Sequence, residues 1–150
     1  MEETLEIRRL GSDDRDVARS LFLMMERVFG ESAVPLSDDY LGTLLGRDDF
    51  WAIAATLDGG VAGGLTAHTL PLTRCEQSEV FIYDIAVVPE FQRRGIGRGL
   101  VEELRRLVTA AGLGEIFVPA DSDDTHALDF YRALGGEPSP VTIFTFPVKT

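Results

Sequence analysis

Apolar and polar residues alternate along this chain with two periods, and each change of period marks a boundary between predicted elements. Alternation with a period of two, or a run of β-branched and aromatic residues, predicts strands at residues 4–10, 50–57, 61–70, 79–88, 115–120 and 141–148. Apolar residues recurring every three or four positions predict helices at residues 13–29, 37–45, 96–111 and 125–134. The resulting order, β-α-α-β-β-β-α-β-α-β, predicts a single α/β (α+β) domain over residues 1–150.

Turn and cap residues support these boundaries. Residues 58–60, Asp-Gly-Gly, predict a tight hairpin turn. Ser12, which two aspartates follow, predicts the start of the first helix, and Asp124 or Thr125 predicts the start of the last one. Pro89 has no N–H to donate to a sheet, so we expect the strand before it to end there.

The composition is that of one ordinary soluble domain. The chain has 150 residues, of which 45% are hydrophobic and 26% are charged, and this is enough for a sizeable core. No apolar run is long enough to cross a bilayer, and the acidic start does not resemble a signal peptide. The single cysteine, Cys75, excludes an internal disulfide and fits a reducing compartment. We therefore expect a cytoplasmic protein with no membrane partner.

Charge narrows the choice of partners. The 14 Lys and Arg against 25 Asp and Glu give a net charge of −11, which opposes nucleic-acid binding and favours a cationic ligand. Acidic residues gather at positions 31–49 and 121–129, whereas basic residues gather at positions 93–106. The sequence therefore predicts a site with one end for a polyanion and the other for a polycation. Helix caps and solvated loops account for some of the acids.

The stretch from residue 80 to residue 106 carries the most specific pattern. A buried strand ends at Pro89, a glycine-rich basic turn follows, and an amphipathic helix begins near Ile96. A helix N-terminus attracts anions through its unpaired N–H groups, and Gly95 and Gly97 leave this backbone bare. We interpret the turn as a phosphate cradle; on spacing alone, a tight turn with solvated arginines fits equally well. The pattern is neither a P-loop nor a dinucleotide fingerprint.

Gln92-x-x-Gly95-x-Gly97, after an Ile-Ala-Val strand end and Pro89, resembles the acetyl-CoA-binding signature of the GNAT N-acetyltransferase superfamily. The resemblance implies the GNAT fold, a mixed and mostly antiparallel sheet of six to seven strands, splayed at its centre and flanked by about four helices. It implies acetyl-CoA (coenzyme A) as co-substrate and no metal. The implied contacts are Ile85, Ala86 and Val87 for the acetyl and pantetheine part, and Gln92, Arg93, Arg94, Gly95, Ile96, Gly97 and Arg98 for the pyrophosphate.

Asp84 is the candidate general base for acetyl transfer to an amine, because the amine must lose a proton before it attacks. This acid stands in an apolar strand beside Ile82, Ile85 and Ala86. Burying an unpaired carboxylate is costly, which favours a functional role, and desolvation would raise its pKa. The alternative is a structural ion pair with an arginine elsewhere in the fold.

Tyr131 is the candidate general acid. Residues 129–135, Asp-Phe-Tyr-Arg-Ala-Leu-Gly, resemble the x-x-Tyr-x-x-x-Gly motif of the GNAT superfamily, whose tyrosine lies near the CoA sulfur. The alternative is core packing, with the hydroxyl satisfied by water. One position departs from the family pattern: Asp124 stands where asparagine is common, and we expect it to face the substrate rather than CoA.

Residues 37–45, 81–87, 120–121 and 123–124 resemble the type I aminoglycoside 3-N-acetyltransferases, within a similarity that extends over residues 37–146. This resemblance implies direct acetylation of the 3-amino group of gentamicin-type antibiotics in a ternary complex, and antibiotic resistance. Carboxylates suit such a polycation because they hold ammonium groups by charge-assisted hydrogen bonds. The expected substrate residues are Glu79, Tyr83, Asp84, Asp121, Asp123 and Asp124. A helix-capping role fits Asp123 and Asp124 equally well.

Two other functions fit the same sequence. An acetyltransferase for another amine, such as a polyamine or a protein N-terminus, would share every CoA feature. A non-catalytic acyl-CoA-binding sensor would keep the cradle, but the presence of both Asp84 and Tyr131 argues against it. The sequence leaves the oligomeric state open, a homodimer included.

Overall fold

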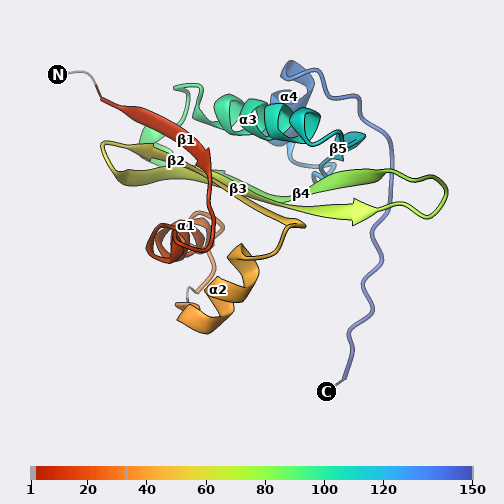
Figure 1. The fold of residues 1–150 in the computed structure, drawn as a ribbon. Helices are drawn as coiled ribbons and strands as arrows, with labels where there is room; N and C mark the ends of the chain where they lie inside the picture. The colour runs from red at the N-terminus through yellow and green to blue at the C-terminus, as the bar shows by residue number, and fades with distance from the viewer. Residues whose placement is uncertain (1–2, 33, 150) are drawn as a thin grey trace. The chain divides into compact units, whose positions relative to one another are not determined.

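The structure, a computed structural model, describes residues 3–32 and 34–149. Its elements are β1 (Leu5–Arg9), α1 (Arg15–Val28), α2 (Asp38–Leu45), β2 (Phe50–Leu57), β3 (Gly60–Pro71), β4 (Ser78–Val87), a 3-10 turn (Pro89–Phe91), α3 (Ile96–Ala110), β5 (Glu115–Phe117) and α4 (Thr125–Ala133) (Figure 1). They fall into two compact units, residues 1–119 with the whole sheet and residues 120–150 with α4. A single domain over residues 1–150 remains a prediction.

The first unit is built on one five-stranded sheet in the order β1-β2-β3-β4-β5. Strands β1 to β4 pair antiparallel with their neighbours, whereas β5 pairs with β4 in parallel. The predicted mixed, mostly antiparallel sheet is therefore confirmed. The hairpin between β2 and β3 has φ of 50° at Asp58 and 87° at Gly59, the left-handed pair that such a tight turn requires.

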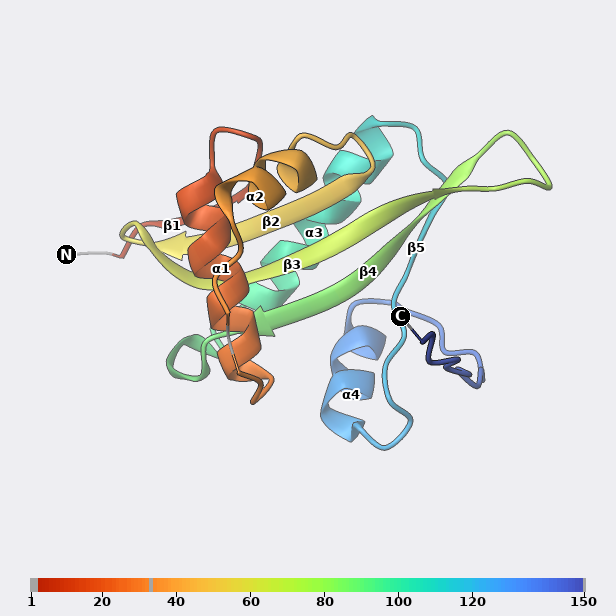
Figure 2. The ribbon, with the colours of Figure 1, turned by 90° about the horizontal axis from the view of Figure 1, so that it is seen from below.

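Helices cover both faces of this sheet, with α1 and α2 on one face and α3 on the other (Figures 1 and 2). Each face has its own apolar core: Leu21, Met25, Leu41, Phe50, Ala52 and Ala86 lie in the first, and Trp51, Ile53, Leu65, Ile82, Leu100 and Leu104 in the second. Strand β2 supplies side chains to both cores, which is why its sequence is almost continuously apolar. Helix α1 approaches β3 closely, because a Cβ on Gly64 would overlap the side chain of Leu21.

The first helix begins later than its sequence predicts. Ser12 is not its N-cap; the cap position is Asp14, and α1 starts at Arg15. The Asp14 carboxylate accepts hydrogen bonds from the Gly11 N–H at 2.8 Å and from Arg8 at 2.9 Å. These two contacts close a turn that contains Ser12, so the predicted start was wrong.

The predicted strand at residues 141–148 is also wrong for this structure. Residues 137–149 carry neither helix nor strand, and β5 covers only Glu115–Phe117 of the expected 115–120. The sheet of the described residues therefore has five strands rather than six or seven. Alternation reports that a segment can form a strand, but a strand also needs an edge with which to pair.

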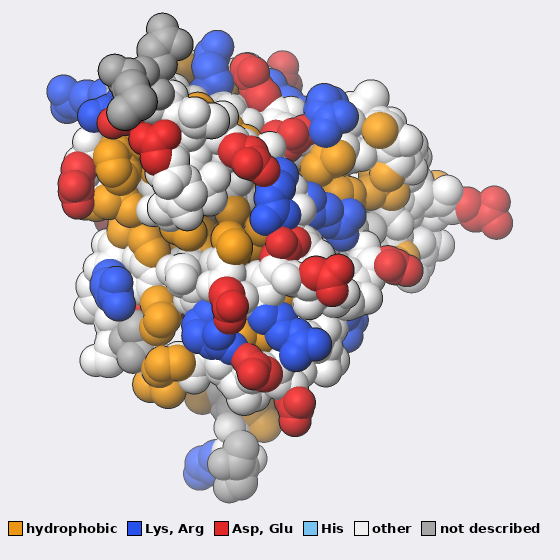
Figure 3. Space-filling model, turned by 60° about the vertical axis from the view of Figure 1, so that its left-hand side comes forward, with side chains coloured by type: hydrophobic (Ala, Val, Ile, Leu, Met, Phe, Trp, Pro, Cys, Tyr) orange, Lys and Arg blue, Asp and Glu red, His pale blue; other side chains and the backbone are white. Residues whose placement is uncertain are grey.

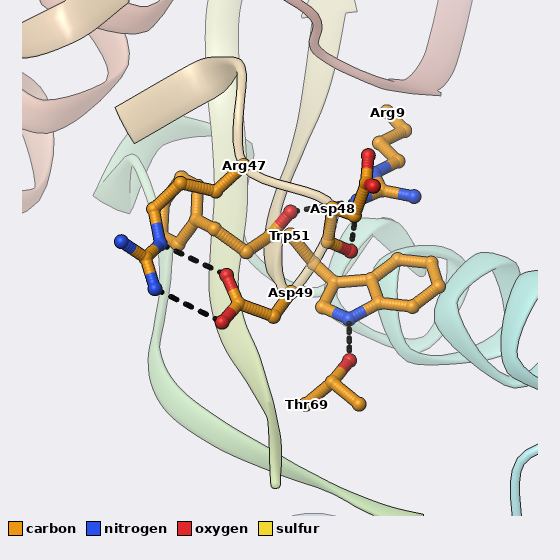
Figure 4. Close-up of polar contacts among 7 residues, drawn as sticks. Arg9, Arg47, Asp48, Asp49, Trp51 and Thr69 are labelled. Atoms are coloured by element: carbon orange, nitrogen blue, oxygen red, sulfur yellow. Dashed lines mark hydrogen bonds and ion pairs between the residues drawn. The ribbon is translucent and has the colours of Figure 1, made fainter. Parts of the chain in front are cut away.

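A polar cluster fixes the entry into β2 (Figure 4). Arg9 donates to the Phe50 carbonyl at 2.7 Å, and its guanidinium lies 3.9 Å from the centre of the Trp51 ring. The Trp51 indole N–H donates to the Thr69 hydroxyl at 2.7 Å. Asp49 accepts two hydrogen bonds from Arg47, at 2.9 and 3.0 Å, so this member of the acidic stretch 31–49 serves the fold.

Within the two described ranges, no helix has the length and apolarity that a membrane crossing requires. The same residues contain no cluster of His, Cys, Asp and Glu side chains that could hold a metal ion.

Candidate active site

Strand β5 accompanies only the first part of β4. The two strands pair through Glu79–Glu115, Val80–Ile116 and Phe81–Phe117, and β5 ends at Phe117. Beyond Phe81 the edge of β4 that faces away from β3 has no strand partner among the described residues. The second half of β4 therefore offers backbone groups to a ligand.

Of the three residues expected to contact pantetheine, two have backbone groups on the open edge of β4. The Val88 N–H donates to the Ala62 carbonyl of the β3 side at 2.9 Å. Because successive strand residues direct their backbone groups to opposite sides, Ala86 pairs with β3, whereas Ile85 and Val87 face the open edge. The Val87 carbonyl already accepts a hydrogen bond from the Gln92 side chain at 3.1 Å. The groups that can bind a ligand are therefore the Val87 N–H and the N–H and carbonyl of Ile85.

The cradle, residues 92–98, has the backbone conformation of an anion site. Arg93 and Gly95 have φ of 65° and 82°, and Gly95 is the residue before the first turn of α3. That turn contains no acid and receives no side-chain cap. The first bond of the helix is that of the Gly99 N–H to the Gly95 carbonyl at 3.0 Å, so the N–H groups of residues 96–98 have no partner within the helix. A pyrophosphate fits this donor set.

The cradle arginines differ in how they are held. Arg94 pairs with Glu3 at 2.9 Å, and Arg98 lies 3.9 Å from Glu102. Arg93 is exposed and has no ion pair among the described residues. Acidic and basic side chains lie side by side over the face drawn in Figure 3.

A β-bulge determines on which face of the sheet the side chain of Asp84 lies. The register of β3 with β4 runs from Thr66–Asp84 to Ala67–Ile82, so Tyr83 is an extra residue on β4. Val80 and Ile82 face the α3 core, and strict alternation would send Asp84 there as well. Because the bulge shifts the alternation by one, Ile85 and Val87 take that face, while Asp84 and Ala86 turn toward α1.

The side chain of Asp84 has no ion pair or hydrogen bond among the described residues, so the structural alternative of an arginine partner is wrong. Burial raises the pKa of its carboxyl above the ordinary value, and the nearby Glu31 charge raises that pKa further. A carboxylate with a raised pKa and no partner suits a group that takes a proton.

The structure adds Glu26 and Glu31 to the neighbourhood of Asp84. The sequence placed Glu31 only within the acidic stretch 31–49 and did not assign Glu26 to the site. A hydrogen bond with Glu31 raises the pKa of Glu26, as do, to a smaller extent, desolvation and the charges of Glu31 and Asp84. Glu26 lies near the end of α1, and Glu31 follows that helix. We call Asp84, Glu26 and Glu31 the carboxylate trio. Acidic clustering pointed to Glu31, but nothing in the local sequence distinguishes Glu26 from a solvated acid.

A hollow of about 270 Å³ lies beside Glu26, and neither Asp84 nor Glu31 lines it. Its walls come from α1 and the chain after it: Phe22, Leu23, Val34 and Leu36 are apolar, and Arg19 and Glu26 are charged. Arg19 forms ion pairs with Asp16 and Asp38, and Glu26 is the acidic side chain that lines the hollow. An apolar wall with one carboxylate suits an amine that carries a hydrocarbon or sugar ring.

The other expected substrate residues of the first unit lie farther along β4. Glu79 precedes Asp84 by five positions, which places it roughly 16 Å away along the strand. Tyr83 is 63% exposed, and its ring meets the edges of Phe81 and His68 at 5.7 and 6.0 Å between centroids. The structure therefore brings Tyr83, but not Glu79, to the neighbourhood of Asp84.

In the second unit, Asp124 caps α4 by accepting a hydrogen bond from the Ala127 N–H at 3.0 Å. The capping alternative therefore holds for Asp124, while the exposed Asp121 and Asp123 contribute only main-chain carbonyls to this turn. Burial raises the pKa of the Tyr131 hydroxyl, and the charge of Asp124 raises it further. The phenol thus keeps its proton at neutral pH, as a general acid must.

Comparison with known proteins shows which family the chain resembles. A profile of the Acetyltransferase (GNAT) family matches residues 16–135. An aminoglycoside acetyltransferase from an uncultured soil metagenomic sample, solved in complex with sisomicin, is 33% identical, with a TM-score of 0.92 and coverage of 97% of each chain. A second such enzyme from a soil metagenomic sample is 32% identical, with a TM-score of 0.92 and coverage of 97% of this chain and 99% of the other.

Curated relatives match over shorter segments. The chloroplastic GCN5-related N-acetyltransferase 2 of Arabidopsis thaliana is 42% identical over 59 residues, which are 39% of this chain and 22% of that protein. The alanine N-acetyltransferase of ribosomal protein bS18 from Salmonella typhimurium is 33% identical over 64 residues, 43% of each chain. The chain thus covers less than half the length of these relatives.

Proposed function

The chain belongs to the GNAT acetyltransferase family, and on that premise we propose that it transfers the acetyl group of acetyl-CoA to an amine of an aminoglycoside antibiotic. The observation that supports this most directly is the unpartnered side chain of Asp84, which lies beside the open-edge residue Ile85 and near Glu31. Acetyl-CoA, when bound, supplies an activated acyl group. The cradle would hold its pyrophosphate, and the Ile85 and Val87 backbone would hold its pantetheine arm.

In this proposal Asp84 accepts the proton that the attacking ammonium group loses. The amine then attacks the thioester carbon: a nitrogen–carbon bond forms as the carbon–sulfur bond breaks, and the departing sulfur takes a proton from Tyr131. The nitrogen loses its second proton to solvent, and solvent returns a proton to Tyr131. Burial raises the pKa of Asp84, which makes its carboxylate a stronger proton acceptor, and raises the pKa of Tyr131, which favours the protonated phenol that a general acid requires. The approach of a cation lowers the pKa of Asp84 again and so favours its ionised form.

An aminoglycoside is the substrate class that the charges favour. It carries several ammonium groups, and the carboxylate trio, with Asp121, Asp123 and Asp124, can hold them by charge-assisted hydrogen bonds. The relatives of soil metagenomic origin are aminoglycoside acetyltransferases, and one of them was solved with sisomicin. We place the acetyl group on the 3-amino group of a gentamicin-type antibiotic, and we propose that cells expressing the protein in their cytoplasm resist such antibiotics.

Release of the CoA thiol across a panel of amines tests the proposal. We expect turnover with gentamicin and sisomicin, and little with spermidine or with peptides that have a free N-terminal alanine. Tandem mass spectrometry of the product locates the acetyl group. A product modified at another amine would overturn the 3-amino assignment alone, whereas no aminoglycoside turnover would overturn the substrate class.

Protein N-terminal acetylation is the second candidate, because a curated relative acts on the alanine of ribosomal protein bS18. Turnover with alanine peptides but not with aminoglycosides would favour it. Thiol release with none of these amines, together with tight CoA binding, would favour a non-catalytic acyl-CoA sensor.

A further inference from the structure

Thr66 places a hydroxyl in the apolar middle of β3. It is 9% exposed, and it is the one polar or charged residue of the described ranges that is buried. The other residues at positions 61–67 are glycine or apolar. Valine favours a strand as well as threonine does, and it would spare the fold the cost of burying a hydroxyl. Strand formation alone therefore does not explain the threonine at this position.

The Thr66 hydroxyl has no hydrogen-bond partner among the described residues. It differs in this respect from the Thr69 hydroxyl on the same strand, which accepts a hydrogen bond from the Trp51 indole. Every side-chain nitrogen or oxygen that is sealed from solvent in the described part of the chain does have a partner, so the Thr66 oxygen is not sealed. A small hydrogen-bond donor can therefore reach it.

The bulge in β4 sets this hydroxyl opposite the candidate base. Toward the outer end of the pairing, Ala67 opposes Ile82. An unbroken register would then set Thr66 opposite Tyr83, but the extra residue on β4 puts Asp84 in that place. The irregularity that turns Asp84 toward α1 thus also gives it a polar neighbour across the sheet.

Thr66 and Asp84 share one face of the sheet. Leu65 and Ala67 lie in the core under α3, so Thr66 between them faces α1, as Asp84 does. Opposed residues on one face have Cβ atoms about 4.5–5.5 Å apart, yet these two side chains form no hydrogen bond with each other. An atom that lies between them can be within hydrogen-bond reach of both.

The nitrogen of an ammonium group is an atom of the required kind. It carries three N–H donors, and a partly buried N–H that finds no acceptor is costly. Asp84 can take one of them as the proton that the nitrogen must lose. The Thr66 oxygen has two lone pairs and no charge, so it can accept a second N–H without competing for that proton.

We propose that Thr66 is a second residue that binds the attacking amine, its hydroxyl oxygen accepting an N–H hydrogen bond while Asp84 takes the proton that the nitrogen loses. This inference rests on the proposed acetyl transfer to an amine and adds a contact to the reacting nitrogen from the strand opposite the base. Two fixed hydrogen bonds orient the nitrogen, so its lone pair is directed before it attacks. The binding of CoA does not involve this contact.

Two substitutions separate the hydroxyl from the shape of the side chain. Thr66→Val replaces the hydroxyl by a methyl group of similar size, whereas Thr66→Ser keeps the hydroxyl and removes a methyl group. We expect kcat/KM for gentamicin to fall about 10-fold or more in Thr66→Val, because a hydrogen bond to a charged group is lost. Thr66→Ser should stay close to the unmodified protein.

The Tm should rank these two variants in the reverse order. Thr66→Val removes an unpaired buried hydroxyl and should be at least as stable as the unmodified protein, whereas Thr66→Ser leaves a small void and should be less stable. A merely structural role would make activity follow stability. Thr56→Val is the matched control, because it makes the same exchange at a half-buried position of β2 and should leave kcat/KM unchanged.

Binding without chemistry gives a second readout. With CoA in place of acetyl-CoA no acetyl group can be transferred, so calorimetric titration with sisomicin measures binding alone. Thr66→Val should bind sisomicin about 10-fold more weakly than the unmodified protein. Thr66→Ser should bind it as the unmodified protein does, and both variants should bind CoA equally well.

The outcomes distinguish this inference from the proposed function. No turnover of any amine by the unmodified protein would overturn the proposed function and this inference with it. If another amine of the panel is the substrate, that amine replaces gentamicin and the same ranking is expected. Turnover by the unmodified protein, with equal kcat/KM and equal sisomicin affinity in Thr66→Val, would overturn the role of Thr66 alone. An active Thr66→Val beside an inactive, unstable Thr66→Ser would show that Thr66 serves the fold.

Discussion

The cradle and the carboxylate trio are assembled in different ways: the cradle follows the end of β4, and the trio surrounds Asp84 within that strand. The cradle is one continuous segment, in which Gly95 sets the turn and the next three N–H groups of α3 supply the donors. The trio takes one carboxylate from β4, one from α1 and one from the chain after α1. Neither Glu26 nor Glu31 adjoins Asp84 in sequence.

This difference shows which groups determine the binding of the anionic cofactor and which determine the binding of the cationic substrate. A polyanion can be held by backbone groups that any local sequence with the right glycines presents. A polycation must be held by side chains, and these can come from any element that the fold brings together. The cofactor end should therefore respond to changes of backbone and bulk, whereas the acceptor end should respond to single charges.

The largest expected effect is that of Asp84→Asn on turnover. Removing a general base lowers kcat by about 100- to 10,000-fold, whereas CoA binding, measured by isothermal titration calorimetry, should change little. Glu115→Gln, the same carboxylate-to-amide change on the neighbouring strand, is the control and should leave kcat unchanged. Equal turnover in Asp84→Asn would remove Asp84 from the mechanism.

The same variant should be more stable at neutral pH. The folded-state pKa of Asp84 is raised above its ordinary value of 3.8, so the ionised carboxylate costs the fold stability above the folded-state pKa and costs nothing below the unfolded-state one. Asparagine removes this cost. Thermal unfolding should show a higher Tm for Asp84→Asn at pH 7 and a vanishing difference as the pH falls below 3.8. A lower Tm at pH 7 would show that Asp84 has a stabilising partner.

Next in size is the loss of CoA binding in Gly97→Asp. The new carboxylate would oppose the pyrophosphate and block the bare amides; losing two charge-assisted hydrogen bonds of this kind weakens binding about 100-fold. An acid in the first turn of a helix favours the fold, so the Tm should be unchanged or slightly higher. Thr109→Asp adds the same charge to the last turn of α3 and should bind CoA normally. Tight CoA binding by Gly97→Asp would show that the cradle is elsewhere.

Glu31→Gln should have a smaller, pH-dependent effect. Glu31 raises the pKa of Asp84, so its removal lowers that pKa and moves the acid limb of the kcat/KM profile to lower pH. The KM for an aminoglycoside should rise, because one carboxylate fewer faces the cation. Asp39→Asn, at an exposed position of α2, is the control. An acid limb that does not move would separate Glu31 from Asp84.

The smallest effects are those expected at Asp124, where two substitutions separate two roles. Asp124→Ala removes the α4 cap and should cost about 1 kcal/mol of unfolding free energy. Asp124→Asn keeps a capping oxygen and removes only the charge, so stability should hold. A raised KM in Asp124→Asn would then identify a substrate contact, whereas an unchanged KM would leave Asp124 with the cap alone.

Local patterns predicted most of the fold. β2, the hairpin after it, the end of β4 near Pro89 and the start of α3 all follow from residues within a few positions of one another. The misses have nonlocal causes. The cap position is Asp14 rather than Ser12, and Arg8 of the preceding strand donates a hydrogen bond to the Asp14 carboxylate. Residues 141–148 have no strand partner in the described structure.

The candidate site likewise has features that local sequence predicts and features that it does not. The glycines and arginines of the cradle can be read from one segment, and so can the exceptional acid at residue 84. The bulge at Tyr83 could not be predicted, because alternation assigns Asp84 to the face of Ile82, and only the register with β3 reveals the extra residue. Glu26 and Glu31 look like solvated acids until α1 is packed across the sheet.

The assignment of CoA to the cradle and of the aminoglycoside to the carboxylate trio can be tested by amide NMR of the full chain, titrated first with CoA and then with sisomicin. CoA should shift the amide signals of Ile96, Gly97 and Arg98, and sisomicin should then shift those of Glu26, Glu31 and Asp84 while the first set stays in place. If CoA leaves the signals of residues 96–98 unchanged, or if sisomicin moves them and spares the trio, the assignment of the two ends is contradicted.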